Sequence, residues 1–187
     1  MPSRDYRIFI GAFPAGELAE RLQAVQARYD PPTAHITPPH ITLAGTCWRS
    51  GPATPDNEAA LVARLQSVPR QIAPFELRLG GIYTFLLADH PVIYLGVELS
   101  PEVVAARRAL LALLGDPERK PRRFTPHLTL AMRLNEAQAQ RMVLELQASE
   151  WATGRWAAPI HELRLMQRGL NEPAWRAIAW VPLVGQT

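Results

Sequence analysis

Apolar residues recur along the chain with two different periods. A continuous apolar run at 8–13 is typical of a β-strand, and apolar positions three to four residues apart then predict a helix ending near Tyr29. The same order returns later, with a strand at 92–97 and a helix that begins after Ser100. Further helices are predicted around 58–66 and 136–147. The pattern therefore indicates strands and helices that alternate along the chain.

One hexapeptide occurs twice. The segment 39–44 returns as 126–131 with five of six positions identical, and its two histidines are 87 residues apart. A second repeat, Glu-Leu-Arg-Leu, occurs at 76–79 and again at 162–165. Matched flanks around both motifs indicate an internal duplication. Such a duplication determines the architecture of the fold.

The duplication predicts an α+β fold in one bilobal domain spanning 1–187, with an internal repeat at approximately 6–86 and 91–184. We expect two pseudo-symmetric antiparallel sheet lobes with outer helices and a central cleft. The two motif strands would face one another across that cleft. Loops or turns are predicted at 46–56, 88–91 and 118–123, where proline, glycine or charged residues gather.

Each repeated motif carries a His-x-Thr triplet. Side chains two positions apart on a strand share one face, so His40 lies with Thr42, and His127 lies with Thr129. One neutral imidazole can remove a proton while a protonated one donates, since the ordinary pKa of histidine is about 6.5. The hydroxyls can donate hydrogen bonds to phosphate oxygens. The set suits phosphoryl transfer.

Composition narrows the other possibilities. A single cysteine, Cys47, excludes an intramolecular disulfide and a cysteine-based zinc site, and no histidine pair has the helical spacing of a zinc site. We therefore expect neither a metal nor a cofactor. The polar N-terminus followed by a short apolar run predicts neither a signal peptide nor a membrane span, so a cytoplasmic monomer is expected. The net charge of +3 permits an anionic substrate.

A third His-x-Thr triplet begins at His35, five residues before His40. It precedes two prolines and lacks the Leu-Ala that follows the other two motifs, so 35–37 is predicted to form a loop. Only His40 matches the second motif in context. His35 is therefore interpreted as an exposed or rim residue.

Paired His-x-Thr motifs half a chain apart resemble the 2H phosphoesterase superfamily. Within it, the chain resembles the 2′-5′ RNA ligase family, whose members are also described as RNA 2′,3′-cyclic phosphodiesterases. The resemblance implies metal-free hydrolysis of a terminal 2′,3′-cyclic phosphate to a 2′-phosphate, with 2′-5′ ligation as the reverse reaction. It also implies that His40 donates a proton, that His127 acts as the base, and that Thr42 and Thr129 hold the phosphate. Pseudo-symmetry leaves the two histidine roles interchangeable.

The chain departs from the family pattern after the second motif. Met132 stands where family members commonly carry an arginine, and Arg133 follows one position later. On a strand, that shift would turn Arg133 to the opposite face.

The expected partners are RNA ends or small cyclic-phosphate nucleotides. Arg122 and Arg123 precede the second motif and could contact an RNA backbone, as could Arg133, although a solvated loop is an equal interpretation for 118–123. Tyr83 and Phe85, predicted in a loop after the first Glu-Leu-Arg-Leu, could stack on a base. Two alternatives stay open: a same-fold enzyme for 2′-5′ oligonucleotides or a cyclic nucleotide metabolite, and a non-catalytic module that binds RNA ends.

Overall fold

The computed structural model describes residues 4–67, 72–87, 90–114 and 124–184. Strands and helices alternate as the hydrophobic pattern predicted. The strands are β1 (Tyr6–Ala12), β2 (Ile41–Arg49), β3 (Phe75–Leu87), β4 (His90–Val97), β5 (His127–Ala131), β6 (Arg155–Ile160), β7 (Glu162–Gly169) and β8 (Arg176–Pro182). The helices are α1 (Gly16–Tyr29), α2 (Pro31–Ile36), a 3₁₀ turn η1 (Pro55–Glu58), α3 (Ala59–Leu65), α4 (Pro101–Leu114), α5 (Glu136–Gln147) and α6 (Glu150–Thr153).

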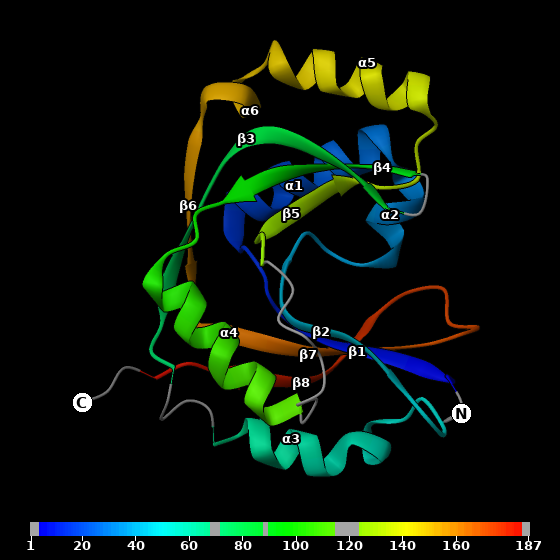
Figure 1. Cartoon of the computed structure of the whole chain (residues 1–187), viewed down its shortest axis with the longest axis vertical. Helices are drawn as coiled ribbons and strands as arrows, with labels where there is room; N and C mark the ends of the chain where they lie inside the picture. Colours follow the sequence, from blue (N-terminus) through cyan, green and yellow to red (C-terminus); the bar gives the residue numbers. More distant parts are fainter. Residues whose placement is uncertain (1–3, 68–71, 88–89, 115–123, 185–187) are drawn as a thin grey trace.

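All eight strands belong to one antiparallel sheet in the order β6-β3-β4-β5-β2-β1-β7-β8 (Figure 1). The predicted α+β class with antiparallel strands is confirmed. The two lobes are the two halves of this sheet. They are joined through the motif strands β2 and β5, which pair with each other at a single position, Ile41 with Leu128. Beyond that point the strands separate.

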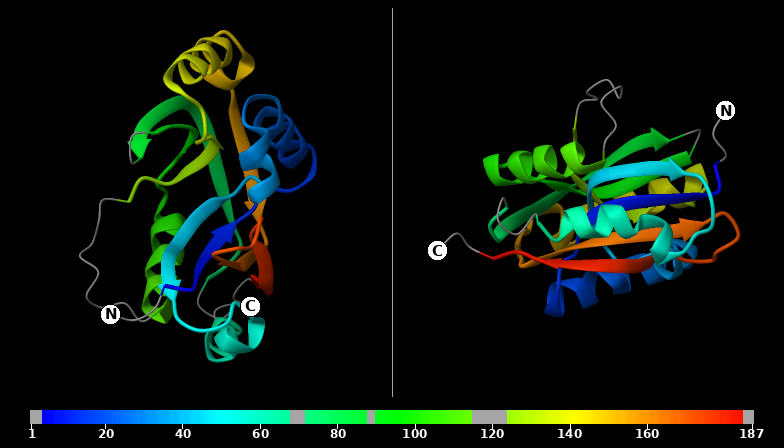
Figure 2. Two further views of the ribbon diagram at one scale, coloured as in Figure 1. Left: turned by 90° about the vertical axis from the view of Figure 1, so that its right-hand side faces the viewer. Right: turned by 90° about the horizontal axis from the view of Figure 1, so that it is seen from below.

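Each lobe contains strands from both halves of the sequence. The second Glu-Leu-Arg-Leu lies on β7, which pairs with β1, while the first lies on β3, which pairs with β4. The helices cross over too, since α4 packs against β2 and α1 packs against β5. Figure 2 shows the two half-sheets and their helices from two further sides. Each motif strand is therefore held by elements from both halves.

Along both motif strands, buried apolar residues alternate with half-buried polar residues, as the sequence predicted. Ile41, Leu43, Leu128 and Leu130 are fully buried, whereas the threonines between them are only half-buried. Burial of each such side chain contributes roughly 1.5–3 kcal/mol. This one-sided burial holds the opposite face of both motif strands, with its polar side chains, away from the core.

Two long side chains hydrogen-bond to the motif strands. Arg107 on α4 donates through Nη1 to the carbonyl of Leu43, at 2.6 Å. Gln26 on α1 donates through Nε2 to the carbonyl of Thr129, at 2.8 Å. Buried carbonyls need partners, so these crossed bonds stabilise both strands where the direct β2–β5 ladder is absent.

Several predicted loops are in fact regular structure. The predicted loop at 46–56 begins only after Arg49, because β2 keeps pairing with β1 up to the pair of Tyr6 with Arg49. A register shift accommodates Gly45, whose φ is +105° and whose added Cβ would lie 2.9 Å from the Ile8 carbonyl oxygen. This close approach explains why glycine stands at this position.

Two further segments are corrected in the same way. His35 and Ile36, predicted in a loop, lie in α2, which is capped by Asp30. His90 and Pro91, predicted in a turn, begin β4. Residues 88–89 and the predicted loop at 118–123 lie outside the described residues. Among the helices of the described part of the chain, none combines the length and apolar character needed to cross a bilayer.

Candidate active site

Both motif histidines lie where their strands begin. His127 is the first residue of β5 and His40 directly precedes β2. The Nδ1 atom of each ring lies near the carbonyl oxygen two residues upstream, at 2.9 Å for Pro38 and 2.8 Å for Thr125. A carbonyl oxygen only accepts, so Nδ1 carries the hydrogen in both rings. This leaves Nε2 of each ring without the hydrogen, in a geometry that suits proton transfer.

The two threonines follow their histidines by two residues. Thr42 pairs with Gly11 of β1, and Thr129 pairs with Tyr94 of β4. Both threonines are half-buried beside strand residues that are fully buried. The motifs flank the contact of β2 with β5, and the imidazoles are close enough for a charge on His127 to lower the pKa of His40.

The His40 ring packs among aromatic side chains. Phe9 stacks on it with ring centroids 4.7 Å apart, and Phe13 stacks at 5.3 Å. Desolvation by this burial, with a smaller contribution from the charge of His127, lowers the pKa of His40 to about 4, although the hydrogen bond to Pro38 acts in the opposite direction. His40 is therefore neutral near pH 7 in the free protein.

An NMR titration should show this displaced pKa. We expect the His40 ring resonance of the free protein to titrate with a midpoint of about 4. Inorganic phosphate should raise the midpoint, because an adjacent anion favours imidazolium. The variant His127→Gln should raise it too, by removing a like charge. A midpoint at the ordinary value of about 6.5 would contradict the proposed effect of burial.

The same shift has a consequence for stability. The unfolded chain regains the ordinary histidine pKa and binds a proton that the folded protein excludes. The contribution of His40 to stability is therefore constant above about pH 6.5 and decreases as the pH falls towards about 4.

His127 has a different set of neighbours. The rings of Phe85 and Tyr94 each meet it edge-on, with centroids 5.3 Å away. Tyr83 stacks on Tyr94 at 5.7 Å and is 53% exposed. These aromatic side chains form a partly exposed wall beside the histidine.

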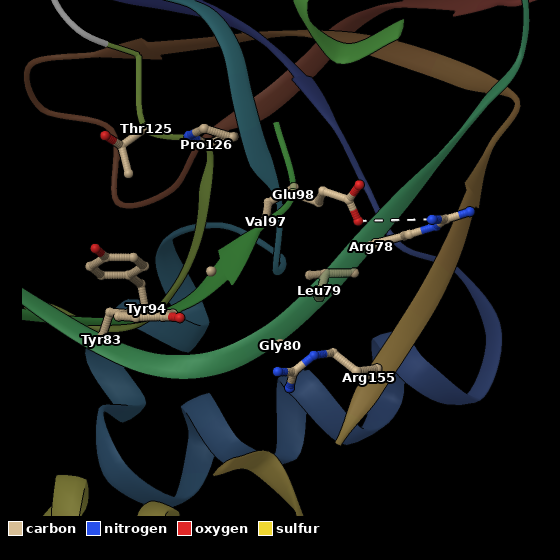
Figure 3. Close-up of a pocket in the computed structure, with 11 residues that line it drawn as sticks. Arg78, Leu79, Gly80, Tyr83, Tyr94, Val97, Glu98, Thr125, Pro126 and Arg155 are labelled. Atoms are coloured by element: carbon tan, nitrogen blue, oxygen red, sulfur yellow. Dashed lines mark ion pairs between the residues drawn. The ribbon is translucent and has the colours of Figure 1, made fainter. Parts of the chain in front are cut away.

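A cavity of about 360 Å³ opens next to this wall. Figure 3 shows Tyr83 and Tyr94 at one side of the cavity and Arg78 and Arg155 at another. Thr125, whose carbonyl accepts the hydrogen bond of His127, also lines it. The cavity thus reaches from the His127 motif to an aromatic surface that could hold a planar ring.

Asp30 connects the two halves of the chain behind the site. Its side chain is 1% exposed and accepts hydrogen bonds from the backbone N–H and the hydroxyl of Thr33, at 3.1 and 2.7 Å. Its Oδ2 also accepts from the backbone N–H groups of Met132 and Arg133, at 2.8 and 2.9 Å. One carboxylate therefore caps α2 and anchors the chain directly after β5, which carries His127 and Thr129.

The other predicted residues are placed as follows. Tyr83 and Phe85 lie on β3, not in a loop, because that strand continues as one arm of a hairpin with β4. Arg133 is exposed, and β5 has already ended at Ala131, so the strand-face argument for Arg133 is wrong. Arg122 and Arg123 lie outside the described residues.

Sequence reasoning proposed Phe85 but missed Asp30 and the aromatic neighbours Phe9, Phe13 and Tyr94. Strand periodicity puts Phe9 on the opposite face of β1 from the core residues Ile8 and Ile10, and this was a signal that its ring lies on the site face. For Asp30, the helix-cap pattern before two prolines was visible, whereas its bonds to the β5 end were not. Within the residues that the structure describes, no group of three or more His, Cys, Asp and Glu side chains could hold a metal ion.

Comparison with known proteins decides the family. A model of the 2′-5′ RNA ligase superfamily matches residues 14–172. The chain belongs to this superfamily. A Bacillus cytotoxicus protein with the provisional name phosphoesterase is 30% identical over 132 residues, covering 71% of this chain and 73% of that protein. A Bacillus anthracis protein with the same provisional name is 26% identical over 170 residues, covering 90% and 92%.

A solved structure of another protein has a similar fold. E. coli LigT, crystallised with 3′-AMP, is similar to the chain with a TM-score of 0.66 and 22% identity. The match covers 97% of this chain and 99% of LigT. The superfamily member described here thus has the LigT fold over nearly its whole length.

Proposed function

We propose that the protein is a metal-independent phosphodiesterase that hydrolyses 2′,3′-cyclic phosphate ends of RNA to 2′-phosphates. The observation that carries this proposal is the matched pair of histidines, each with Nδ1 bonded to a carbonyl and Nε2 left to transfer a proton. Family membership supports phosphoester chemistry.

The reaction needs one base and one acid. One histidine takes a proton from water as the water oxygen bonds to phosphorus. The bond from phosphorus to the ribose O3′ breaks, and the other histidine gives that oxygen a proton, leaving a 2′-phosphate and a free 3′-hydroxyl. Thr42 and Thr129 would donate to the non-bridging oxygens, whose charge must be held in the transition state. A cyclic diester has a strained ring and one negative charge, which suits this chemistry.

The environment of His40 bears on the two roles. A neutral His40 is ready to accept a proton, which favours His40 as the base and His127 as the acid. This is the reverse of the roles that the family resemblance implies. As an acid, His40 would first have to gain a proton when the anionic phosphate binds.

The cavity beside His127 supports a nucleotide as the substrate. A base could stack on Tyr83, which lines this cavity, or on Phe85, which lies outside its lining and contacts the His127 ring. Arg122, Arg123 and Arg133 remain proposed contacts to an RNA backbone. The E. coli LigT structure with 3′-AMP is consistent with a nucleotide phosphate in this fold. In the same attack, a ribose 5′-hydroxyl in place of water would form a 2′-5′ linkage as the bond to O3′ breaks, and cleavage of that linkage would be the reverse reaction.

A panel assay tests the proposal. The protein is incubated with RNA ending in a 2′,3′-cyclic phosphate, with 2′-5′-linked dinucleotides and with cyclic mononucleotides, and the product ends are identified. We expect 2′-phosphate ends from the first substrate and unchanged rates in excess EDTA. Loss of activity on chelation would contradict the metal-free mechanism. Turnover of 2′-5′ dinucleotides alone would instead favour the same-fold alternative, and binding without turnover would favour a non-catalytic module.

A further inference from the structure

Two arginines lie side by side on the lobe that carries His40. Arg7 of β1 and Arg168 of β7 are direct cross-strand partners. Like charges directly opposite one another destabilise a sheet. Among the described residues neither guanidinium has a carboxylate within ion-pair distance, and Arg168 donates through Nε only to the backbone carbonyl of Glu172, at 2.9 Å. The pair therefore concentrates positive charge that no side chain in the described ranges neutralises at ion-pair distance.

Indole rings hold the Arg7 side chain in place. Its Cζ lies 5.2 Å from the ring centroid of Trp48 and 5.4 Å from that of Trp175, which are cation–π distances. Burial, followed by the charge of Arg168, lowers the pKa of Arg7. A half-buried guanidinium beside a second one is costly in the free protein. An anion bound between them would offset that cost.

This cluster continues the surface on which His40 lies. Trp175 meets Phe9 with centroids 4.8 Å apart, and Phe9 stacks on His40. Arg7 and Phe9 are two residues apart on β1 and share a face, so they are separated by about 7 Å along the strand. A ligand held at the histidines could therefore extend along β1 to the arginines.

We infer that Arg7 and Arg168 form a second phosphate-binding subsite, with Trp48 and Trp175 as stacking surfaces beside it. The inference rests on the proposed function and specifies its substrate as a nucleotide with a second phosphate one unit from the reacting one. Guanidinium groups suit phosphate because they donate paired hydrogen bonds. Indole rings accept a neighbouring base by stacking. The second phosphate belongs either to the next internucleotide linkage of an RNA or to a free nucleotide terminus.

Binding without turnover tests this subsite. By calorimetry, adenosine 3′-monophosphate is compared with adenosine 3′,5′-bisphosphate and with a 3′-phosphorylated 3′-5′ diadenylate, none of which has a cyclic phosphate. We expect a second phosphate to tighten binding by about tenfold or more, as charge-assisted bonds do. The gain should largely disappear in Arg7→Gln and in Arg168→Gln. The control Arg28→Gln, an exposed arginine paired with Glu145 on the opposite lobe, should keep it.

The outcomes separate the possible sources. A gain with the bisphosphate alone assigns the subsite to a free nucleotide terminus, and a gain with the diadenylate assigns it to an RNA chain. If neither second phosphate tightens binding, or if the gain survives both substitutions, the subsite is refuted. If Arg7→Gln fails to fold, Arg168→Gln and the charge-conserving Arg168→Lys still show whether the gain in binding depends on the arginine pair. Hydrolysis of cyclic phosphates without the gain would refute the subsite alone, whereas the gain without any hydrolysis would refute only the proposed function.

Discussion

Alanine at His40 or at His127 is expected to lower kcat for a 2′,3′-cyclic phosphate by roughly 10²–10⁴-fold, the usual contribution of a positioned acid or base. Each substitution removes one Nε2 and leaves the partner histidine in place. The measurement is steady-state turnover of a cyclic nucleotide, with thermal unfolding as a check of the fold. His35→Ala is the matched control, since His35 is exposed on α2 and should retain full activity. Full activity in either motif variant would refute the two-histidine mechanism.

The same two variants can assign the acid and the base. A phosphodiester with a nitrophenol leaving group needs little protonation as its bond breaks, so loss of the acid costs less with it than with a ribose leaving group. If His127 is the acid, His127→Ala should recover much of its lost rate on the nitrophenyl diester and His40→Ala should not. The opposite pattern would restore the roles that the family resemblance implies, with His40 as the acid.

Alanine at Asp30 is expected to reduce the free energy of unfolding by roughly 2–4 kcal/mol. The substitution leaves the backbone N–H groups of Met132 and Arg133 without their acceptor and removes the cap of α2. Chemical denaturation monitored by circular dichroism measures the change. Asp56→Ala is the matched control, because Asp56 is exposed and surface changes are usually within about 0.5 kcal/mol.

Asp30 should also affect activity, as a positioning residue for the end of β5. Below the unfolding transition, Asp30→Asn is expected to lower kcat for the cyclic phosphate more than it raises KM, because His127 and Thr129 shift relative to the opposite motif. Asn keeps the shape and can still accept hydrogen bonds, so it should be more stable than the alanine variant. Wild-type kcat in Asp30→Asn would limit Asp30 to a purely structural role.

Local features of this protein followed from the sequence because they depend on neighbours along the chain. Strand alternation put Ile41 and Leu43 in the core and left Thr42 on the other face. The helix predicted at 136–147 matches α5, which begins with a capping box formed by Asn135 and Gln138. The repeated hexapeptide selected His40 over His35, since its context, rather than the bare triplet, was duplicated.

Tertiary structure alone decided which strands the two repeated Glu-Leu-Arg-Leu strands pair with. From the sequence, each Glu-Leu-Arg-Leu belonged with the histidine motif of its own half, yet β7 pairs with β1 and β3 pairs with β4. Strand pairing is a non-local contact, and an apolar strand fits either half of the sheet equally well by pattern. The loop predicted around Tyr83 was wrong for the same reason, because only its pairing with β4 makes that segment a strand.

The chemical character of the candidate site also needed the tertiary structure. The sequence supplied two imidazoles and two hydroxyls, but the pKa of His40 depends on Phe9 and Phe13, which pack around it from an earlier strand and its following turn. Arg7 and Arg168 lie far apart in the chain and become neighbours only through the β1–β7 register. Residue identity and spacing thus determined which groups are available, whereas desolvation and charge proximity, which arise only on folding, decided how those groups can act.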